Sequence, residues 1–449
     1  MNVQNQRVLV VGLGQTGQSL LTYLTQAGAT VAGFDAHLSP ERRAALTQAY
    51  GPDVAWFSGD LATVLASHDF DALAVSPGVS TRTPEIQAFQ AKGGRVVGDV
   101  ALWAELVQQT SSKVIAITGS NGKSTVTALV GFLCERLGLN TVVAGNIGLP
   151  VLDAWAAQKG VPADVWVVEL SSFQLDTVTR LNADAVCVLN ISEDHLDRYD
   201  NLLDYAHSKA KILLGAKLQV LNADDALCRA MAAKGEAIKW FSLVQKSDYW
   251  VDVAQPSLPL MQGDQALFSA LDLPLQGLHN AANVLVALAL CEGIGLDSAQ
   301  LCQALPDFRG LAHRVEKVGE KNGVVFIDDS KGTNVGATCA ALAGFVAPVL
   351  LIAGGDGKGQ DFSLLAGTVA AKAKAVLLIG RDAPLIAEAC AHLSVPVMHC
   401  ETLPEATAKA YALASAGDIV LLSPACASWD MFDNYGHRAK VFIEAFHTL

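Results

Sequence analysis

The stretch that decides the fold is Val114-Ile115-Ala116-Ile117-Thr118-Gly119-Ser120-Asn121-Gly122-Lys123-Ser124-Thr125. An apolar run (114–117) precedes the glycines and a helix-forming run (128–137) follows them, which predicts a strand, a phosphate loop and a helix. In such a loop Lys123 contacts the β- and γ-phosphates, and the Ser124 hydroxyl binds Mg²⁺. The alternative is an ordinary glycine-rich turn, which leaves the lysine and the hydroxyls unexplained. The residues assigned to phosphate binding are Gly119, Asn121, Gly122, Lys123, Ser124 and Thr125.

Outward from this loop, short apolar runs alternate with Ala- and Leu-rich stretches along the chain. Continuous apolar runs suit parallel strands buried on both faces, and their alternation with helices predicts an α/β fold. A less helical region, 245–272, is expected to add antiparallel strands. The predicted strands are 7–12, 72–75, 114–118, 164–169, 185–190, 324–327, 349–353 and 419–423.

The length of 449 residues predicts about three domains. A polar stretch before the strand at 114 suggests one boundary near Glu105. A second boundary is expected near 307–310, after the helix that holds 281–290. The predicted domains are residues 1–104, 105–309 and 310–449.

The composition excludes several classes of protein. Hydrophobic residues make up 51% and charged residues 17%, which excludes a disordered chain. The formal net charge of −13 offers no general basic surface for nucleic acid. The 9 cysteines form no CxxC pair, which fits a reducing compartment better than a disulfide framework or a zinc site.

The mean hydropathy of +0.33 makes a membrane segment worth testing. The uncharged stretch 332–355 contains several glycines, Asn334 and Pro348, and favours a buried helix, a turn and a buried strand over a span. The first residues show no charged-then-apolar leader. We therefore expect a cytoplasmic protein that is not inserted in a membrane.

Polar residues that follow predicted strands are candidates for chemistry. Glu169 ends a strand, where open α/β sheets bind ligands, and it could hold Mg²⁺; the alternative is an acid favoured by a helix N-terminus. His195 lies beside acids after the strand at 185–190, which favours a ligand or substrate contact over a structural role. Lys209, one helix further on, belongs by composition to a solvated helix face.

A second glycine motif, Gly12-Leu13-Gly14-Gln15-Thr16-Gly17, follows the first predicted strand, and Asp35 ends the next one. By itself this pattern predicts a dinucleotide fold with Asp35 on a ribose, and raises an NAD-dependent dehydrogenase as a hypothesis. The same geometry holds any pyrophosphate at a helix N-terminus, so a UDP-linked ligand fits equally well. A dehydrogenase leaves the phosphate loop unused, and a non-enzymatic nucleotide-binding regulator leaves Glu169 and His195 without a role.

Motifs in a fixed order along the chain resemble those of the Mur ligase family. They are GSNGKST (119–125), ELSSFQL (169–175), NISEDHLDR (190–198), LHNAAN (278–283), HRVE (313–316), DDSKGTN (328–334), GGDGK (354–358) and SPACASWDMF (423–432). The resemblance implies a Rossmann-like UDP-binding domain (1–104), a P-loop ATPase-like domain (105–309) and a Rossmann-like amino-acid-binding domain (310–449).

The resemblance implies an ATP-dependent ligase of peptidoglycan precursor synthesis. In the implied reaction ATP phosphorylates the carboxylate of UDP-N-acetylmuramoyl-L-alanine, and the amine of D-glutamate attacks the resulting acyl phosphate. Charge builds on phosphoryl oxygens, so the reaction needs Mg²⁺, a lysine and positioning. The last two motifs resemble the D-glutamate-adding branch; other muramyl-peptide ligases and folylpolyglutamate synthetases are the alternatives. We expect a monomer whose partners are these two substrates.

The resemblance also implies roles for residues of the central motifs. Lys123, His195 and Lys209 are implied in catalysis, with Lys209 carbamylated. The implied metal ligands are Ser124, Glu169, His195 and carbamylated Lys209. The implied nucleotide contacts are Asn280 and Asn283 to adenine, Arg314 to the γ-phosphate and Asp329 to the ribose.

Residues of the outer domains receive substrate roles from the same resemblance. Ala36 and His37 depart from the family pattern after Asp35, and Tyr435 stands where a phenylalanine is common. The implied contacts to the UDP-linked substrate are Gln15, Thr16, Asp35, Ser76 and Asn146. The implied contacts to D-glutamate are Thr333, Lys358, Ser428 and Tyr435.

Overall fold

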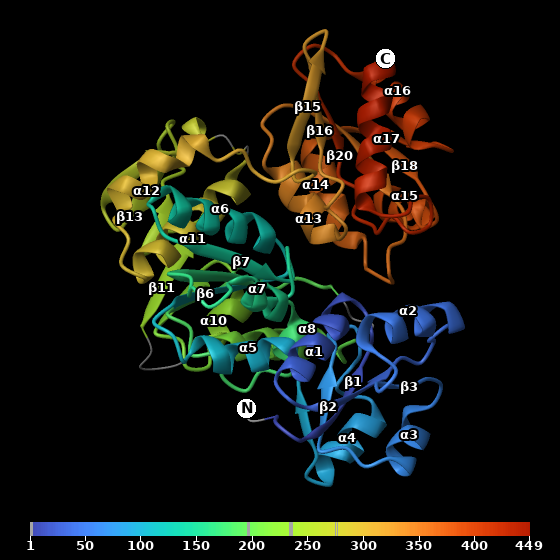
Figure 1. Ribbon diagram of the computed structural model, residues 1–449. Coiled ribbons are helices and arrows are strands. Elements are labelled where there is room, and N and C mark those ends of the chain that lie inside the picture. Colours follow the sequence, from blue (N-terminus) through green and yellow to red (C-terminus); the bar gives the residue numbers. More distant parts are fainter. Residues whose placement is uncertain (1–2, 195–197, 233–236, 274, 276) are drawn as a thin grey trace.

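The computed structural model describes residues 3–194, 198–232, 237–273, 275 and 277–449. Its strands form three separate sheets, and helices cover them, so the predicted α/β architecture is confirmed. In Figure 1 the blue N-terminal part and the red C-terminal part both adjoin the green and yellow central part.

The N-terminal part is a parallel five-stranded sheet in the order β3-β2-β1-β4-β5. Its middle strand, β1, pairs with β2 and β4, with Val8 opposite Val31 and Ala72. Four of the five residues of β1 are buried, which explains its lack of polar alternation. The elements are β1 (Arg7–Val11), α1 (Gln15–Gln26), β2 (Thr30–Phe34), α2 (Pro40–Tyr50), β3 (Ala55–Phe57), α3 (Leu61–Ser67), β4 (Ala72–Val75), α4 (Pro84–Ala91), β5 (Arg95–Val97) and α5 (Asp99–Val107).

The central part contains a nine-stranded sheet in the order β14-β13-β12-β11-β10-β9-β6-β8-β7. Helix α11, which is buried along most of its length, packs against α6 and the sheet. The elements are β6 (Lys113–Thr118), α6 (Lys123–Arg136), β7 (Thr141–Gly145), α7 (Val151–Ala157), β8 (Val165–Glu169), α8 (Ser172–Leu175), β9 (Ala185–Val188), α9 (Leu202–Ala210), η1 (Lys211–Leu213), β10 (Leu218–Asn222), α10 (Ala226–Met231), β11 (Ile238–Ser242), β12 (Tyr249–Val251), β13 (Pro259–Gln262), β14 (Gln265–Ser269), η2 (Ala270–Asp272), α11 (Leu278–Gly293), α12 (Ser298–Ala304) and η3 (Leu305–Asp307).

The order of these strands places a crevice next to β6. The chain passes from β6 outward to β7 and back to β8 on one side, and then crosses to β9 on the other side. In open α/β sheets such a reversal leaves a crevice outside the carboxyl ends of the strands, where ligands bind. The glycine loop after β6 lies at this point.

The region 245–272 extends the central sheet as expected. Strand β13 runs antiparallel to both β12 and β14, with Leu260 opposite Val251 and Phe268. The prediction of added antiparallel strands is therefore confirmed.

The C-terminal part is a six-stranded sheet in the order β15-β16-β20-β17-β18-β19, in which only the β15–β16 pair is antiparallel among the described strands. The uncharged stretch 332–355 forms α13 and β17 with Pro348 between them, as expected. The elements are β15 (Glu316–Lys321), β16 (Val324–Asp328), α13 (Val335–Ala343), β17 (Val349–Gly354), α14 (Ser363–Lys372), β18 (Ala373–Ile379), α15 (Ala383–Cys390), β19 (Val397–His399), α16 (Leu403–Leu413), β20 (Ile419–Leu422) and α17 (Tyr435–Thr448).

The boundaries 1–104, 105–309 and 310–449 remain a proposed division. The first boundary falls inside α5, whose Trp103 ring centroid lies 5.3 Å from that of Trp166 in β8. Trp155 of α7 stacks on Trp166 from another side, at 6.1 Å. Helix α5 therefore packs on the central part, whereas the second boundary falls in the loop between η3 and β15.

Within the described ranges, no helix combines the length and the apolar character that crossing a bilayer requires.

Candidate active site

The phosphate loop packs closely against neighbouring elements and is hydrogen-bonded to one of them. Gly119 has φ +149°, and a Cβ there would lie 2.8 Å from the Cβ of Leu189. Gly122 has φ +86°, and a Cβ there would lie 2.8 Å from the Asn283 Oδ1. Asn190, which follows β9, accepts from the Asn121 N–H at 2.8 Å and donates to the Asn121 carbonyl at 3.1 Å. The loop is thus fixed against β9 and α11 before any ligand is bound.

The lysine at the end of this loop already donates hydrogen bonds within the loop. Lys123 Nζ donates to the carbonyls of Gly119 and Ser120, at 2.7 and 2.9 Å. Burial lowers the pKa of Lys123 below its ordinary value, and Glu169 and Asp194 partly oppose this. A phosphate that replaced the two carbonyls would give the lysine a stronger acceptor.

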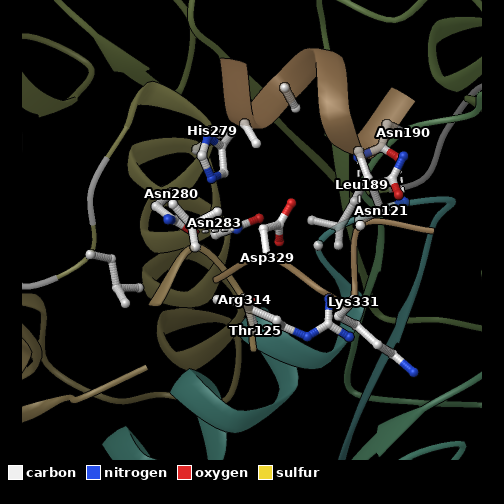
Figure 2. Close-up of a pocket in the computed structure, with 18 of the residues that line it drawn as sticks. Asn121, Thr125, Leu189, Asn190, His279, Asn280, Asn283, Arg314, Asp329 and Lys331 are labelled. Atoms are coloured by element: carbon white, nitrogen blue, oxygen red, sulfur yellow. Dashed lines mark hydrogen bonds between the residues drawn. The ribbon is translucent and has the colours of Figure 1, made fainter. Parts of the chain in front are cut away.

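A cavity of about 220 Å³ opens beside the loop, between the central and C-terminal parts (Figure 2). Asn280 and Asn283 lie on one side of it and Asn121 and Asn190 on the other, with the Asp329 carboxylate between them. Asn280 and Asn283 lie three residues apart in α11, and Asn283 Nδ2 donates to Asn280 Oδ1 at 3.1 Å. Thr125 and Arg314 also line this cavity.

His279 is a lining residue that the sequence reasoning missed, although it directly precedes Asn280. Burial lowers its pKa to about 4, so the imidazole is neutral at physiological pH. Asn190 was missed too, although it ends the predicted strand 185–190 just as Glu169 ends the predicted strand 164–169, which is the signal that selected Glu169.

Asp329 and Lys331, both from the loop after β16, have pKa values that differ from their ordinary values. Burial raises the pKa of Asp329 to about 7, against a hydrogen bond of 2.7 Å from Ser423 Oγ. Burial also lowers the pKa of Lys331 to about 8, with Arg314 adding to the shift. Buried titratable groups of this kind are typical of functional sites.

A second, more polar cavity of about 520 Å³ adjoins the first on the side of the phosphate loop. It shares lining residues with the first cavity and adds groups from both parts of the chain. Its lining includes Ser120, Lys123, Ser124, Asn146, Glu169, Asp194, His313, Arg314, Lys331, Thr333, Asn334 and Tyr435.

Glu169 and Ser124 fit a hard divalent cation. Glu169 is 2% exposed, and its Oε2 is buried without a hydrogen-bond partner among the described residues. Its Oε1 accepts from Asn146 Nδ2 at 2.8 Å, and Ser124 Oγ accepts from Arg314 Nη2 at 2.7 Å. Carboxylate and hydroxyl oxygens are the ligands that Mg²⁺ prefers. His195, the other predicted metal ligand, lies outside the described residues.

Lys209 is buried, so the interpretation from composition as a solvated helix face is wrong. The side chain is 1% exposed, and Nζ donates to the Gly119 carbonyl at 2.9 Å and to Thr118 Oγ1 at 3.4 Å. Burial, and then the charge of Lys123, lower the pKa of Lys209 well below its ordinary range. α9 turns this lysine towards the base of the phosphate loop, which helical spacing alone does not reveal.

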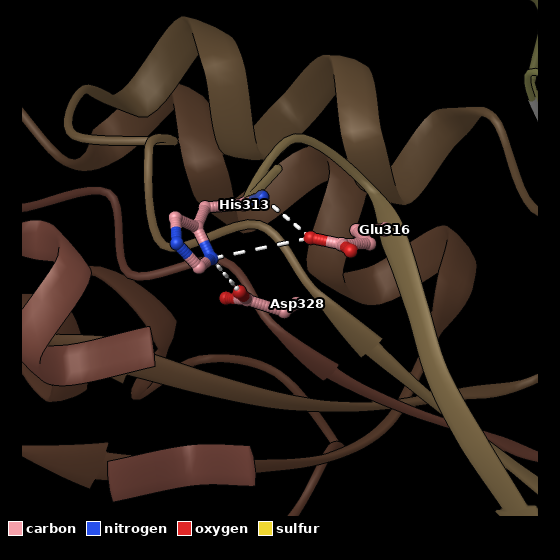
Figure 3. Close-up of side chains that lie close together, drawn as sticks. All are labelled: His313, Glu316 and Asp328. Atoms are coloured by element: carbon pink, nitrogen blue, oxygen red, sulfur yellow. Dashed lines mark hydrogen bonds and ion pairs between the residues drawn. The ribbon is translucent and has the colours of Figure 1, made fainter. Parts of the chain in front are cut away.

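Arg314 lies between two residues whose backbone is in the left-handed region. Its two neighbours, His313 and Val315, have φ +64° and +50°, a left-handed conformation that costs about 1–3 kcal/mol at a non-glycine residue. Figure 3 shows what holds the segment: His313 Nδ1 lies 2.7 Å from Asp328 Oδ2, and the His313 N–H donates to Glu316 Oε2 at 2.8 Å. These contacts anchor the strained segment to β15 and β16.

The predicted amino-acid contacts only partly converge. Thr333 and Tyr435 line the larger cavity, and Lys331 Nζ lies 4.0 Å from the centroid of the Tyr435 ring. Lys358 and Ser428 do not line that cavity. Lys358 reaches its edge through Asp194 Oδ1, at 3.6 Å, and its backbone has φ +52°.

The predicted UDP-side residues lie at the carboxyl edge of the N-terminal sheet. Gln15 and Thr16 open α1, and Ser76 follows β4. Asp35 accepts from the N–H groups of Leu13 and His37, both at 3.2 Å, so its carboxylate already braces the glycine loop. Asn146 lies apart from these residues, next to Glu169.

Arg42 is a further residue at this edge that the sequence reasoning missed. Its Nη2 donates to the Leu13 carbonyl at 2.6 Å, so a cation from α2 lies against the glycine loop. His37, two residues after Asp35, stands where the family resemblance implies an arginine. The structure thus supplies a guanidinium at this loop from a different position in the sequence.

Comparison with known proteins matches all three parts of the chain. The family profile "Mur ligase MurD-like, N-terminal domain" matches residues 6–98, "Mur ligase middle domain" matches 117–291, and "Mur ligase, glutamate ligase domain" matches 313–426.

Two full-length relatives carry the same name. The chain is 55% identical over 447 residues to the UDP-N-acetylmuramoylalanine–D-glutamate ligase of Chromobacterium violaceum, covering 99% of this chain and 98% of the relative. It is 50% identical to the enzyme of that name from Methylobacillus flagellatus, over 99% of this chain and 97% of the relative.

Solved structures show the same fold at low identity. The MurF ligase of Thermotoga maritima in complex with ADP has a TM-score of 0.61 at 14% identity, covering 99% of this chain and 95% of that one. The UDP-N-acetylmuramate–alanine ligase of Thermotoga maritima has a TM-score of 0.58 at 19% identity, covering 99% and 100%. On the evidence of its three matched domains and its full-length relatives, the chain belongs to the Mur ligase family.

Proposed function

We propose that this protein joins D-glutamate to UDP-N-acetylmuramoyl-L-alanine at the expense of ATP, releasing ADP and phosphate. The observation that carries the proposal is the shared wall of the two cavities, formed by Asn121, Gly122, Arg314 and Lys331 among others. A nucleotide in the first cavity would extend its phosphates past this wall into the second. The names of the full-length relatives support the choice of substrates.

The first step is phosphoryl transfer. A carboxylate oxygen of the UDP-linked substrate attacks the γ-phosphorus, the bond to the β–γ bridging oxygen breaks, and ADP leaves. Lys123 and Arg314 are placed to stabilise the negative charge that spreads over the phosphoryl oxygens. Asn280, Asn283 and Asp329 hold the adenosine, with Gly119, Asn121, Gly122 and Thr125 at the phosphates.

The second step forms the amide. The amine of D-glutamate attacks the acyl carbon, a tetrahedral intermediate forms, and phosphate leaves as the nitrogen loses its proton. Thr333, Lys358, Ser428 and Tyr435 bind the D-glutamate, since a lysine and hydroxyls suit a dicarboxylic amino acid. Lys358 reaches the larger cavity only at its edge, so we expect it to move inward when substrate binds.

Mg²⁺ fits the oxygens of Ser124 and Glu169, and when bound it would neutralise phosphoryl charge. We propose His195 and carbamylated Lys209 as further ligands. The position of Lys209 supports this, because a carbamate would replace a buried cation near Lys123 with an anion.

The UDP end of the substrate is proposed to bind in the N-terminal part. Gln15 and Thr16 would offer backbone N–H groups to the pyrophosphate, Asp35 would accept from uracil, and Ser76 and Asn146 would contact pyrophosphate and muramoyl groups. We propose that the enzyme acts as a cytoplasmic monomer and binds no nucleic acid.

Phosphate release from ATP, with Mg²⁺ and UDP-N-acetylmuramoyl-L-alanine, tests the proposal. We expect release with D-glutamate and none with L-glutamate or without an amino acid. Release with a different acceptor would move the protein to a sister ligase. No release in any arm, together with NAD binding, would favour the dehydrogenase hypothesis, which accounts for the N-terminal part alone.

A further inference from the structure

A turn of the N-terminal part is held by an arginine of the central part. The turn Ser76-Pro77-Gly78 follows β4, at the edge proposed for the pyrophosphate. Arg198 donates from Nη1 to the Gly78 carbonyl at 3.0 Å and from Nη2 to the Pro77 carbonyl at 3.4 Å. Its guanidinium carbon lies 4.3 Å from the centroid of the Phe173 ring. The two N–H groups and the ring together fix the orientation of the guanidinium.

A second arginine joins the same two parts in a different way. Arg82 forms a bidentate ion pair with Asp204 of α9, with Nη2 at 2.8 Å from Oδ1, and lies 5.1 Å over the ring of Tyr199. This ion pair joins the N-terminal and central parts through side chains alone, whereas Arg198 donates to backbone carbonyls of the turn.

The rings beneath these arginines continue towards the phosphate loop. Phe173 stacks on Tyr199 at 6.0 Å, and Tyr199 lies 5.3 Å from Tyr205. The Tyr205 hydroxyl lies 3.4 Å from Ser120 Oγ, and Lys209 Nζ lies 4.6 Å from the Tyr205 ring centroid. A continuous set of packed side chains therefore connects the turn with the loop that binds the nucleotide phosphates.

We propose that Arg198 is a positioning residue that fixes the turn 76–78, and with it the UDP-linked substrate, relative to the phosphate loop. The identity of that substrate rests on the proposed function. The substrate is long: one end binds in the N-terminal part, while its carboxylate reacts in the central part. A small displacement of the turn moves the carboxylate away from the γ-phosphate, and the rate of such reactions falls steeply with misplacement. A planar guanidinium can serve two carbonyls at once, which a lysine ammonium does not reproduce.

The test compares Arg198→Met with Arg136→Met. Arg136 is a matched control, because its guanidinium lies 5.8 Å over the Phe132 ring and pairs with Asp307, within the central part. Losing the two hydrogen bonds lets the turn move, so kcat should fall and the KM for UDP-N-acetylmuramoyl-L-alanine should rise, each by roughly tenfold. We expect the KM values for ATP and D-glutamate to stay within about twofold, and Arg136→Met to change none of the three.

Hydrogen exchange without any substrate gives an independent readout. Amides of residues 76–83 should exchange faster in Arg198→Met than in the wild type, and at wild-type rates in Arg136→Met. If the wild type releases no phosphate with this substrate, the proposed function fails, but the exchange comparison still decides the role of Arg198.

Arg198→Lys keeps the charge and serves if the methionine variant does not fold. We expect it to show the same raised KM and faster exchange. Wild-type KM values together with wild-type exchange in either variant would overturn the proposal, as would an equal rise of all three KM values.

Discussion

Arg314 Nη2 lies 2.7 Å from Ser124 Oγ, although 190 residues separate them. The contact joins the C-terminal part to the first turn of α6, where the proposed magnesium hydroxyl lies. Arg314 uses one of the two lone pairs of this hydroxyl oxygen, and the other remains available to a metal ion.

We expect the three parts to close around the substrates, because groups from all of them must meet within reacting distance. The radius of gyration from small-angle X-ray scattering should fall when a non-hydrolysable ATP analogue, Mg²⁺ and the UDP-linked substrate are added together. Scattering profiles that coincide with and without these ligands would contradict closure.

Lys123→Ala should abolish turnover, because it removes the cation that we propose stabilises the transferred phosphoryl group. The expected loss in kcat is at least about 10²-fold, since removing one electrostatic contact to the transition state typically costs about 10²–10³-fold. Phosphate release measures it, with the exposed Lys246→Ala as a control for the loss of a lysine. Near-normal release by Lys123→Ala would remove the loop from the mechanism.

Lys209→Ala should lose activity and regain part of it when a short carboxylic acid is supplied, because the acid can replace the proposed carbamate. Lys211→Ala is the matched control, since Lys211 lies two residues further on and donates to the Asp176 carbonyl at 3.1 Å. We expect Lys211→Ala to be active without added acid. A loss in Lys209→Ala that no carboxylic acid restores would leave this lysine a structural role.

Asp99→Asn should stabilise the protein above about pH 6. Asp99 is 1% exposed, and burial raises its pKa from 3.8 to about 6. The native state therefore binds more protons than the unfolded state between these values, and the free energy of unfolding falls as pH rises through them, by about 3 kcal/mol in all. Denaturant unfolding at pH 4 and pH 8 measures this, with the exposed Asp69→Asn as control. An equal effect of Asp99→Asn at both pH values would show that the carboxyl does not titrate in this window.

Gly17→Ala should destabilise the N-terminal part, because a Cβ there would collide with the Gly12 carbonyl. Gly14→Ala is the control, since nothing lies within 4 Å of a Cβ at that position. We expect a loss of at least about 2 kcal/mol in the free energy of unfolding for Gly17→Ala and less than about 1 kcal/mol for Gly14→Ala. Equal stability of the two variants would mean that α1 can shift away from β1 without cost.

Much of the fold could be predicted because its signals are local. The apolar runs at 72–75 and 114–118 form β4 and most of β6. Asn280 and Asn283, three residues apart in one helix, are hydrogen-bonded to each other. These features depend on strand burial and helix geometry, which short sequence patterns record.

The rest depends on tertiary contacts. The burial of Lys209 is set by what α9 packs against, and the pairing of Asn146 with Glu169 joins the loop after β7 to the end of β8. The left-handed backbone at His313 and Val315 persists only because Asp328 and Glu316 hold it. No pattern within a single segment encodes these relationships.

The first cavity is lined by two parts of the chain, since Asn280 and Asn283 come from the central part and Asp329 comes from the C-terminal part. A nucleotide bound there contacts both parts, so its binding free energy is lost when either part unfolds. At a hundredfold excess over Kd this adds about 2.7 kcal/mol to the stability of each part. Unfolding of the two parts is therefore coupled through the bound nucleotide, and the melting temperature of both should rise with the nucleotide concentration.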